Sequence, residues 1–321
     1  MQYDKTEYLK MYRQLYFARH YEMKIEEIFL SGKLPGFYHL SIGQEAIQTG
    51  VLDELGPNDW WTPHFRVHPT YAQKVGIKDF TAEMTAKAAG PNHGWASYAH
   101  LTVADKKVGP SNGMLGKAQA IATGIAHAYK VKKVDGCVVI GAGDGSMQEG
   151  LMNELLNIIA AWKLPVAWYV ENNDIAISTK ISEVTGTPDL ADRGKGFGIP
   201  SASYDGDDVL LVREVMHEAI EKARRCEPTI SVFRTSRWRG HFIGDQPDRY
   251  RDQTSYLEEV QAKHDPVRIN KNYLLNNGIA TEAELAAEEK KAMETIEEAF
   301  EYADSCPAPT REEILSVRAT V

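Results

Sequence analysis

The sequence predicts an α/β protein with a mainly parallel sheet that is covered by helices on both faces. Short apolar stretches alternate with helical patterns from residue 117 to residue 235, and strands buried on both faces of a sheet have this appearance. The 321 residues are 43% hydrophobic and 25% charged, which is typical of a protein with a full core. We therefore expect one domain over residues 1–321, with helical extensions at 1–35 and at about 252–321.

The N-terminal extension is predicted to be one long amphipathic helix over residues 5–31. Apolar side chains recur at helical intervals, and Gly32 stands where the helix should end. The chain then turns through Pro35 and Gly36 into a second helix, within the stretch LPGFYHLSIGQEAIQTGVLDEL. Two helices should thus precede the first loop.

Two segments without periodicity separate these helices from the sheet. Residues 56–69, GPNDWWTPHFRVHP, are crowded with aromatic side chains and histidines, and residues 89–116 are rich in Gly, Pro, Asn and Ser. A third helix is expected between them, from about Lys78 to Ala89. Loops as long as the second segment are usually functional or disordered.

The α/β part is predicted to begin at residue 117. Its expected strands are Cys137–Gly141, Val166–Glu171, Ile199–Tyr204 and Thr229–Thr235, and its expected helices are 117–130, Gln148–Trp162 and Asp208–Arg225. The C-terminal third, from about Asp252, has a helical and strongly charged pattern.

Charge and cysteine content argue against several kinds of partner and compartment. The formal net charge is −9, which is unsuited to a polyanionic partner, so we expect no nucleic-acid binding and read Lys130–Lys133 as a solvated helix end. No uncharged stretch approaches about eighteen residues, and the first residues mix charges, so neither a membrane span nor a signal peptide is expected. Cys137, Cys226 and Cys306 are odd in number and widely spaced, as in a cytoplasmic protein.

The stretch VVIGAGDGSMQEG, residues 138–150, suggests two kinds of site. A dinucleotide fingerprint needs a third glycine and, about twenty residues later, an acidic residue that holds the ribose. Here Ser146 replaces that glycine, and the next acid at a strand end, Glu171, lies too far along the chain. The match to a nicotinamide-binding fold is therefore weak.

A metal site is the second interpretation, and chain geometry favours it. About sixteen helical residues travel roughly 24 Å, and the seven extended residues Pro165–Glu171 return roughly 23 Å. Asn172 and Asn173 should thus reach the carboxyl edge of the sheet beside Asp144, where open α/β sheets bind ligands. A carboxylate and an amide oxygen suit Mg²⁺ held together with phosphate oxygens, which implies a diphosphate cofactor. Taken separately, Gly-Asp-Gly and Asn-Asn are also common turns.

The segment GDGSMQEGLMNELLNIIAAWKLPVAWYVENNDIAIST, residues 143–179, closely resembles the thiamine diphosphate motif of the alpha subunits of 2-oxo acid dehydrogenase decarboxylases. This family includes pyruvate, branched-chain 2-oxo acid and acetoin dehydrogenases. The resemblance extends over nearly the whole chain, through FYHLSIGQEA, SNGMLGKAQAIATGIA, RWRGHFIGD and DPVRINKNYLLNNG. It implies the thiamine diphosphate-binding fold, and within that fold the type of domain that binds the diphosphate end of the cofactor.

The resemblance implies a set of ligands for the metal and the diphosphate. Mg²⁺ would be bound by Asp144, the Asn173 side chain and the Ile175 carbonyl. Gly145 and Ser146 would approach the diphosphate through backbone groups.

It also implies the other contacts of the cofactor and the catalytic histidines. Arg66 matches a diphosphate-binding arginine, and arginine pairs well with phosphate; Phe65 stands where the family commonly has tyrosine. The residues that match contacts of the aminopyrimidine are Gly113 and Leu115. His241 and His39 match two active-site histidines, which suits proton transfer near neutral pH.

Partners are implied by what the chain lacks. In this family the glutamate that activates the pyrimidine comes from a separate beta subunit, and the chain has little room for a second α/β domain. The resemblance thus implies an α2β2 assembly that transfers an acyl group to a lipoyl domain through the loop after His241. A merely solvated loop is the alternative for that segment, which contains Asp245, Arg249, Tyr250 and Arg251.

Several departures from the family and several rival functions narrow the prediction. Phe242 replaces a regulatory serine, and GWASYAH replaces a glycine-rich stretch, so pyruvate should not be assumed to be the substrate. Rival functions are the N-terminal half of a split transketolase, which would carry a GHPG-type stretch that is absent here, and a non-catalytic thiamine-binding subunit. His64 and His68 have a spacing seen in zinc sites but lack the glutamate of that motif.

Overall fold

The computed structural model describes residues 2–34, 36–187 and 189–317. Expectations for Met1, Pro35 and the end of the C-terminal extension, 318–321, lie outside these residues. The long N-terminal helix is confirmed as α1, Lys5–Leu30, with Asp4 as its N-cap, and the second helix as α2, Glu45–Glu54. Near the end of α2, the Asp53 carboxylate accepts a hydrogen bond from Gln14 of α1 at 2.9 Å.

The central sheet is parallel and has the strand order β1-β2-β3-β7-β6. Its strands are β1 Trp60–Thr62, β2 Val138–Gly143, β3 Val166–Asn172, β6 Ser201–Asp205 and β7 Thr229–Arg234. A two-stranded antiparallel hairpin, β4 Ile175–Ala176 with β5 Thr179–Lys180, follows β3. The predicted mainly parallel sheet is therefore confirmed.

Helices cover both faces of the sheet because successive strand residues point in opposite directions. On one face Ile140, Trp168 and Val232 pack with helices α5, Lys117–Lys132, and α6, Gly150–Trp162. On the other face Tyr169 and Phe233 pack against α9, Val209–Arg224. The remaining short helices beside the sheet are α7 Ile181–Val184 and α8 Ala191–Gly196.

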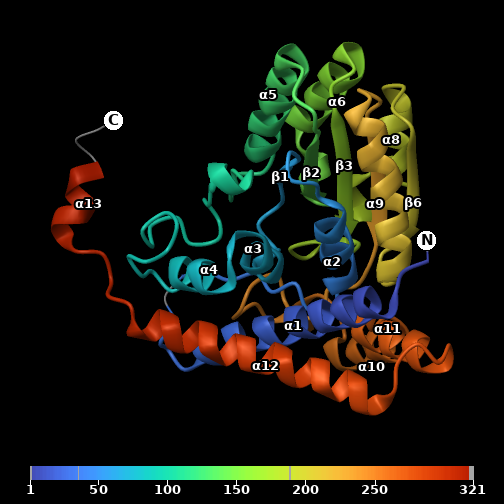
Figure 1. Cartoon of the computed structure of the whole chain (residues 1–321). Helices are drawn as coiled ribbons and strands as arrows, with labels where there is room; N and C mark the ends of the chain where they lie inside the picture. The colour runs from blue at the N-terminus through green and yellow to red at the C-terminus, as the bar shows by residue number, and fades with distance from the viewer. Residues whose placement is uncertain (1, 35, 188, 318–321) are drawn as a thin grey trace.

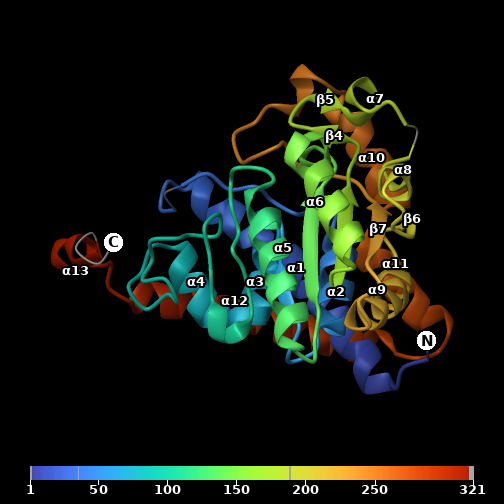
Figure 2. The same cartoon turned by 90° about the horizontal axis from the view of Figure 1, so that it is seen from above.

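The C-terminal region consists of helices, and the longest of them runs beside α1. These helices are α10 Gln253–Lys263, α11 Pro266–Asn276, α12 Glu282–Ser305 and α13 Arg311–Val317. Figures 1 and 2 show α1 and α12 side by side, with α13 extending away from the body of the molecule. No described helix is long and apolar enough to cross a membrane.

The segment predicted as a loop at residues 56–69 contains regular structure, and this expectation is wrong in part. β1 has three residues, too few for an alternating pattern to show, and it pairs with β2 alone in the sheet. Helix α3, His68–Val75, has proline in its first turn, where the missing N–H does no harm.

The third predicted helix is shorter than expected. It is α4, Ile77–Met84, and does not continue to Ala89. The buried carboxylate of Glu83 accepts N–H groups of Asn92, Gly94 and Ala96 at 2.7, 3.0 and 2.8 Å. The chain beyond Met84 folds back onto this carboxylate, which shapes the start of the long loop.

Candidate functional site

One cavity of about 690 Å³ lies at the carboxyl edge of β2 and β3. Every residue that the sequence proposed for the site lines it. These residues are His39, Phe65, Arg66, Gly113, Leu115, Asp144, Gly145, Ser146, Asn173, Ile175 and His241. Segments from the N-terminal third, the sheet and the loop after β7 therefore meet at one place.

Asp144 directly follows β2 and Asn173 directly follows β3, so both lie at the same edge of the sheet. The lengths of the helix and the strand between them predicted this placement. The Asp144 N–H donates to the Glu171 carbonyl at 3.2 Å, which joins the two strand ends. Asn173 Nδ2 donates to Gln44 Oε1 at 3.1 Å. Asn173 Oδ1 and Asp144 Oδ2 are both buried, and neither has a hydrogen-bond partner among the described residues.

The pKa of Asp144 is raised to about 6, first because the carboxyl group is buried. The hydrogen bond from the Gly145 N–H and the guanidinium group of Arg237 act in the opposite direction. An additional cation beside this carboxylate would favour its charged form.

The loop after Asp144 comes close to the hairpin β4–β5. A Cβ atom on Gly145 would lie 2.6 Å from the Ala176 Cβ, so only glycine fits there without movement. Ser146 Oγ donates to the Gly143 carbonyl at 2.6 Å and closes a tight turn at the end of β2. Gly145 and Ser146 both line the cavity at this turn.

Arg237 holds the hairpin in place from the loop after β7. Its guanidinium group donates to the carbonyls of Ile175 at 3.2 Å and Ile177 at 2.9 Å. Ile177 has φ of +56°, a conformation that β-branched residues rarely adopt. Contacts from Arg237 therefore stabilise a strained backbone, which is a common feature of functional sites.

Arg66 and Arg237 place two buried guanidinium groups at the cavity, and neither forms an ion pair within the described part of the chain. Arg66 donates instead to the Leu40 carbonyl at 2.9 Å and the His241 carbonyl at 2.9 Å. Burial and the nearby Arg237 lower the pKa of Arg66 to about 10. Buried cations without anionic partners are costly, so this cavity is suited to an anion.

The rings of His39 and His241 lie 4.7 Å apart between centroids, and both are neutral at pH 7. Burial, then Arg66, lower the pKa of His39 to about 2 and that of His241 to about 3. Arg66 Nη2 lies 3.2 Å from His241 Nδ1. Because a guanidinium can only donate, Nδ1 is the acceptor and His241 carries its proton on Nε2.

His39 has the opposite tautomer. Its Nδ1 lies 2.8 Å from the Tyr98 hydroxyl, and that hydroxyl donates its own proton to the Phe37 carbonyl. His39 Nδ1 must therefore donate to Tyr98, which leaves the lone pair on Nε2. The two histidines thus offer one N–H donor and one acceptor.

The remaining proposed residues form the walls of the cavity. Phe65 packs against His39 with ring centroids 4.5 Å apart. Gly113 has open space around the position of a Cβ, and Leu115 is 39% exposed at the cavity. Both belong to the long loop that ends at α5.

His64 and Glu171 form a buried pair that the sequence did not assign to the site. His64 Nε2 lies 2.9 Å from Glu171 Oε1, and His64 Nδ1 accepts the Arg66 N–H at 3.1 Å. Glu171 directly precedes the two asparagines, so the strand-edge argument that found Asn173 could also have found it. His68 pairs with Glu22 instead, so the two histidines have different carboxylate partners.

Three other residues of the wall were given no role from the sequence: Gln44, Tyr98 and Arg237. Gln44 and Arg237 do lie within FYHLSIGQEA and RWRGHFIGD, two of the stretches that carry the resemblance. Gln44 immediately precedes α2, and Tyr98 belongs to the long loop. Arg237 follows β7, whose position beside β3 could not be inferred from the order of strands along the chain.

Comparison with known proteins identifies the family of this chain. Residues 13–312 match the model of the family described as "Dehydrogenase E1 component". The chain is 35% identical to the chloroplastic pyruvate dehydrogenase E1 component subunit alpha-3 of Arabidopsis thaliana, over 97% of this chain and 74% of that protein. It is 34% identical to the pyruvate dehydrogenase E1 component subunit alpha of Zymomonas mobilis, over 97% and 88%.

A relative with a different printed activity is equally similar. The chain is 33% identical to the alpha subunit of acetoin:2,6-dichlorophenolindophenol oxidoreductase from Bacillus subtilis, over 96% of this chain and 92% of that protein. The family model and these relatives extend over nearly the whole chain, and the predicted resemblance is confirmed. This chain belongs to the dehydrogenase E1 component family.

Proposed function

We propose that this chain is the alpha subunit of a thiamine diphosphate-dependent dehydrogenase. The enzyme would cleave a 2-oxo acid by decarboxylation, or cleave acetoin, and pass the acyl group to a lipoyl carrier. Family membership implies thiamine diphosphate, and the relatives are alpha subunits that act in pyruvate or acetoin oxidation. The observation that carries the proposal is one cavity lined by two buried guanidinium groups that form no ion pair among the described residues, and by the buried oxygens Asp144 Oδ2 and Asn173 Oδ1, which have no hydrogen-bond partner there.

The unpaired oxygens fit a magnesium ion. Asp144 Oδ2 and Asn173 Oδ1 would bind it, together with the Ile175 carbonyl, which can accept a second contact beside that of Arg237. One carboxylate with neutral oxygen ligands leaves coordination positions for phosphate oxygens and water, as Mg²⁺ prefers.

The guanidinium groups fit the diphosphate. Arg66 would neutralise part of its charge, and the backbone groups of Gly145 and Ser146 would approach it at the turn where a side chain at position 145 would collide with Ala176. Anion and cations would then satisfy one another inside the cavity, which removes the cost of burying each alone.

The two histidines fit opposite roles in hydrogen bonding. Bound thiamine diphosphate supplies the nucleophilic carbon that attacks the substrate carbonyl. His241, with its proton on Nε2, would donate a hydrogen bond to the oxygen on which negative charge develops. His39, with its lone pair on Nε2, would accept a hydrogen bond from a substrate hydroxyl, because burial and Arg66 lower the pKa of this ring to about 2 and keep it neutral. Their low pKa values keep both tautomers available across the neutral range.

A beta subunit would complete the site. Asp144 and Glu171 are the carboxylates of the described cavity wall; the first is assigned to the metal and the second is paired with His64. Neither carboxylate would then be free to activate the pyrimidine ring of the cofactor, which would lie beside Gly113 and Leu115. We therefore propose that the partner supplies this glutamate in an α2β2 assembly.

Exposed apolar side chains at the cavity support this partner. Phe37 and Ile177 both line the cavity and are 51% and 57% exposed. Large apolar side chains that are exposed to solvent around a cavity are typical of an interaction site.

The loop after His241 would receive the lipoyl domain. Asp245 accepts the His241 N–H and the Tyr250 hydroxyl, both at 2.6 Å, and Arg251 lies over the Tyr256 ring. Three of the four polar residues proposed for docking thus stabilise the loop itself. Exposed Arg249 remains for contact with the carrier.

The cysteines and the relatives bear on the compartment and on the rival functions. The three cysteines are free, which suits a reducing compartment, and we propose the cytoplasm; two relatives are chloroplastic. None of the relatives reported above is a transketolase, and the unpaired groups of the cavity argue against a silent subunit.

Magnesium-dependent cofactor binding tests the proposal directly. Asp144→Asn should abolish it, because the carboxylate that binds the ion is lost, and titration calorimetry with thiamine diphosphate and Mg²⁺ measures the effect. Asp174→Asn removes a nearby but exposed carboxylate and is the matched control, for which a much smaller change is expected. Equal affinities of wild type and Asp144→Asn would rule out the metal assignment.

Activity of the assembled enzyme identifies the substrate. The chain is co-expressed with its beta subunit and assayed by dye reduction with pyruvate, branched-chain 2-oxo acids and acetoin. Turnover of at least one of them, dependent on thiamine diphosphate, is expected.

A further inference from the structure

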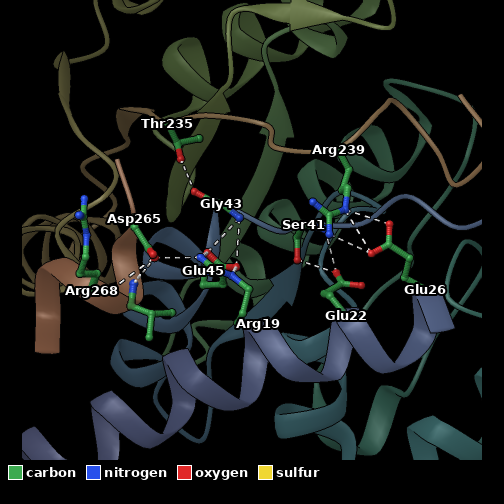
Figure 3. Close-up of polar contacts among 11 residues, drawn as sticks. Arg19, Glu22, Glu26, Ser41, Gly43, Glu45, Thr235, Arg239, Asp265 and Arg268 are labelled. Atoms are coloured by element: carbon green, nitrogen blue, oxygen red, sulfur yellow. Dashed lines mark hydrogen bonds and ion pairs between the residues drawn. The ribbon is translucent and has the colours of Figure 1, made fainter. Parts of the chain in front are cut away.

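Helix α1 presents three charged side chains to the loops of the site. Arg19, Glu22 and Glu26 are spaced i, i+3 and i+7, so they lie along one side of the helix. Figure 3 shows them contacting segments that are far apart in the sequence. None of these three residues lines the cavity.

Glu22 holds the loop that carries His39. Its carboxylate is fully buried and accepts the Ser41 N–H at 2.9 Å, the Ser41 hydroxyl at 2.6 Å and His68 Nδ1 at 2.9 Å. Ser41 is two residues from His39, and His68 is two residues from Arg66. A buried carboxylate with three donors is fixed in position, and it fixes those donors in turn.

Glu26 holds the loop that carries His241. Arg239 makes a bidentate contact with it, with Nε 2.9 Å from Oε1 and Nη2 3.1 Å from Oε2. Arg239 is two residues before His241, and its carbonyl accepts from Arg237 at 3.3 Å. The pair is only partly exposed, which limits screening by solvent.

Arg19 holds the start of α2. It contacts both carboxylate oxygens of Glu45, at 2.5 and 3.1 Å, and Asp265 at 3.1 Å. Glu45 in turn accepts the Gly43 N–H at 3.0 Å. Gly43 also connects the loop before α2 to the segment before Arg239, because the Thr235 hydroxyl donates to the Gly43 carbonyl at 3.0 Å.

The two histidine loops also pack directly on each other, so the helix positions them as a unit. The Ile243 N–H donates to the Tyr38 carbonyl at 2.9 Å, and the Trp238 N–H donates to the Ile42 carbonyl at 3.2 Å. A Cβ on Gly43 would lie 2.4 Å from the Ser236 carbonyl oxygen, and Gly43 has φ of +98°. The side chains of α1 therefore set where this joined pair of loops lies.

We propose that α1 positions both histidines of the site, with Glu22 acting through Ser41 and His68 and Glu26 acting through Arg239. This inference depends on the proposed function for its effect on turnover. The histidines lie in loops without regular backbone pairing of their own, and a displacement of about 1 Å can cost about 100-fold in rate. Glu22 and Glu26 are thus positioning residues, and the N-terminal helix is part of the working site.

The Glu26–Arg239 pair provides the sharper test, because replacement of fully buried Glu22 could prevent folding. We expect Glu26→Gln in the full chain to speed amide hydrogen exchange at Trp238, His241 and Ile243 by about 10-fold, the equivalent of about 1.4 kcal/mol. Glu27→Gln, at the next position of the same helix and largely exposed, is the matched control and should leave these amides unchanged. The double variant Glu26→Arg with Arg239→Glu should restore slow exchange.

Turnover of the complex with the beta subunit gives the second measurement. Glu26→Gln should lower kcat by about 10- to 100-fold while the KM of the substrate changes little, because the histidines are displaced and binding groups are not. Unchanged exchange in Glu26→Gln, or an equal response in Glu27→Gln, would overturn the positioning role. Failure of the wild-type complex to turn over would overturn the proposed function alone, since the exchange measurement needs neither cofactor nor substrate.

Discussion

The protonation of individual side chains decides what the site can do. The Arg66 guanidinium can only donate a hydrogen bond to His241. The Tyr98 hydroxyl donates its own proton to the Phe37 carbonyl and therefore accepts a hydrogen bond from His39. Each histidine therefore has a defined tautomer, set by a guanidinium at the ring of His241 and by a neutral hydroxyl at the ring of His39. Burial, and after it the nearby Arg66 guanidinium, lower the pKa of both rings and keep them neutral, so the site separates a hydrogen-bond donor from an acceptor by environment alone.

Replacement of His241 tests its role at this scale. His241→Ala should retain cofactor binding to within about 10-fold, because Arg66 keeps its contact with the main-chain carbonyl of residue 241, and should lose about 100- to 10,000-fold in kcat. Calorimetry and steady-state kinetics of the complex measure the two quantities. His217→Ala, on the exposed side of α9, is the control; full activity of His241→Ala would end the catalytic assignment.

At the scale of elements, the site depends on how helices bring loops to the sheet edge. Helix α2 begins beside the cavity, with Gln44 bound to Asn173, and packs along its length against α9. Gly50 permits this close approach, because a Cβ there would lie 2.6 Å from the Val212 Cγ1. Packing of α2 on α9 therefore determines where the loop before it can reach.

Gly50→Ala should lower the free energy of unfolding by about 1–3 kcal/mol, because the methyl group forces the two helices apart. Gly124→Ala, in α5, is the matched control: nothing lies within 4 Å of its Cβ position. Glycine loses more conformational entropy than alanine when a helix forms, so this control should be more stable by about 0.5–1 kcal/mol. Denaturant unfolding of the isolated chain measures both, and equal effects of the two substitutions would contradict the packing argument.

At the scale of the whole molecule, one cavity collects charged and polar groups whose missing partners a bound ligand would supply. Arg66 and Arg237 donate hydrogen bonds but form no ion pair among the described residues, and Asp144 Oδ2 and Asn173 Oδ1 at the same cavity have no hydrogen-bond partner there. Helices α1 and α12 run side by side along one side of the molecule (Figure 1). Stability of the molecule should therefore respond to cofactor and metal together.

Magnesium and thiamine diphosphate at about 100 times their dissociation constant should stabilise the assembled protein by about 2.7 kcal/mol. Differential scanning calorimetry should show a higher apparent Tm with both ligands present. Removal of Mg²⁺ with a chelator should abolish the increase, as should Asp144→Asn. An increase that persists in the chelator would mean that the ion does not bridge protein and cofactor.

The sequence by itself determined the parallel α/β class, the long first helix and the meeting of Asp144 with Asn173. These follow from local periodicity and from the equal lengths of a helix and the strand that returns beside it. Only the tertiary structure decided that Arg237 reaches the Ile175 carbonyl, that His64 pairs with Glu171, and that Glu26 holds Arg239. Such contacts depend on strand order and on loops that pack across long sequence separations, and neither leaves a periodic pattern in the chain.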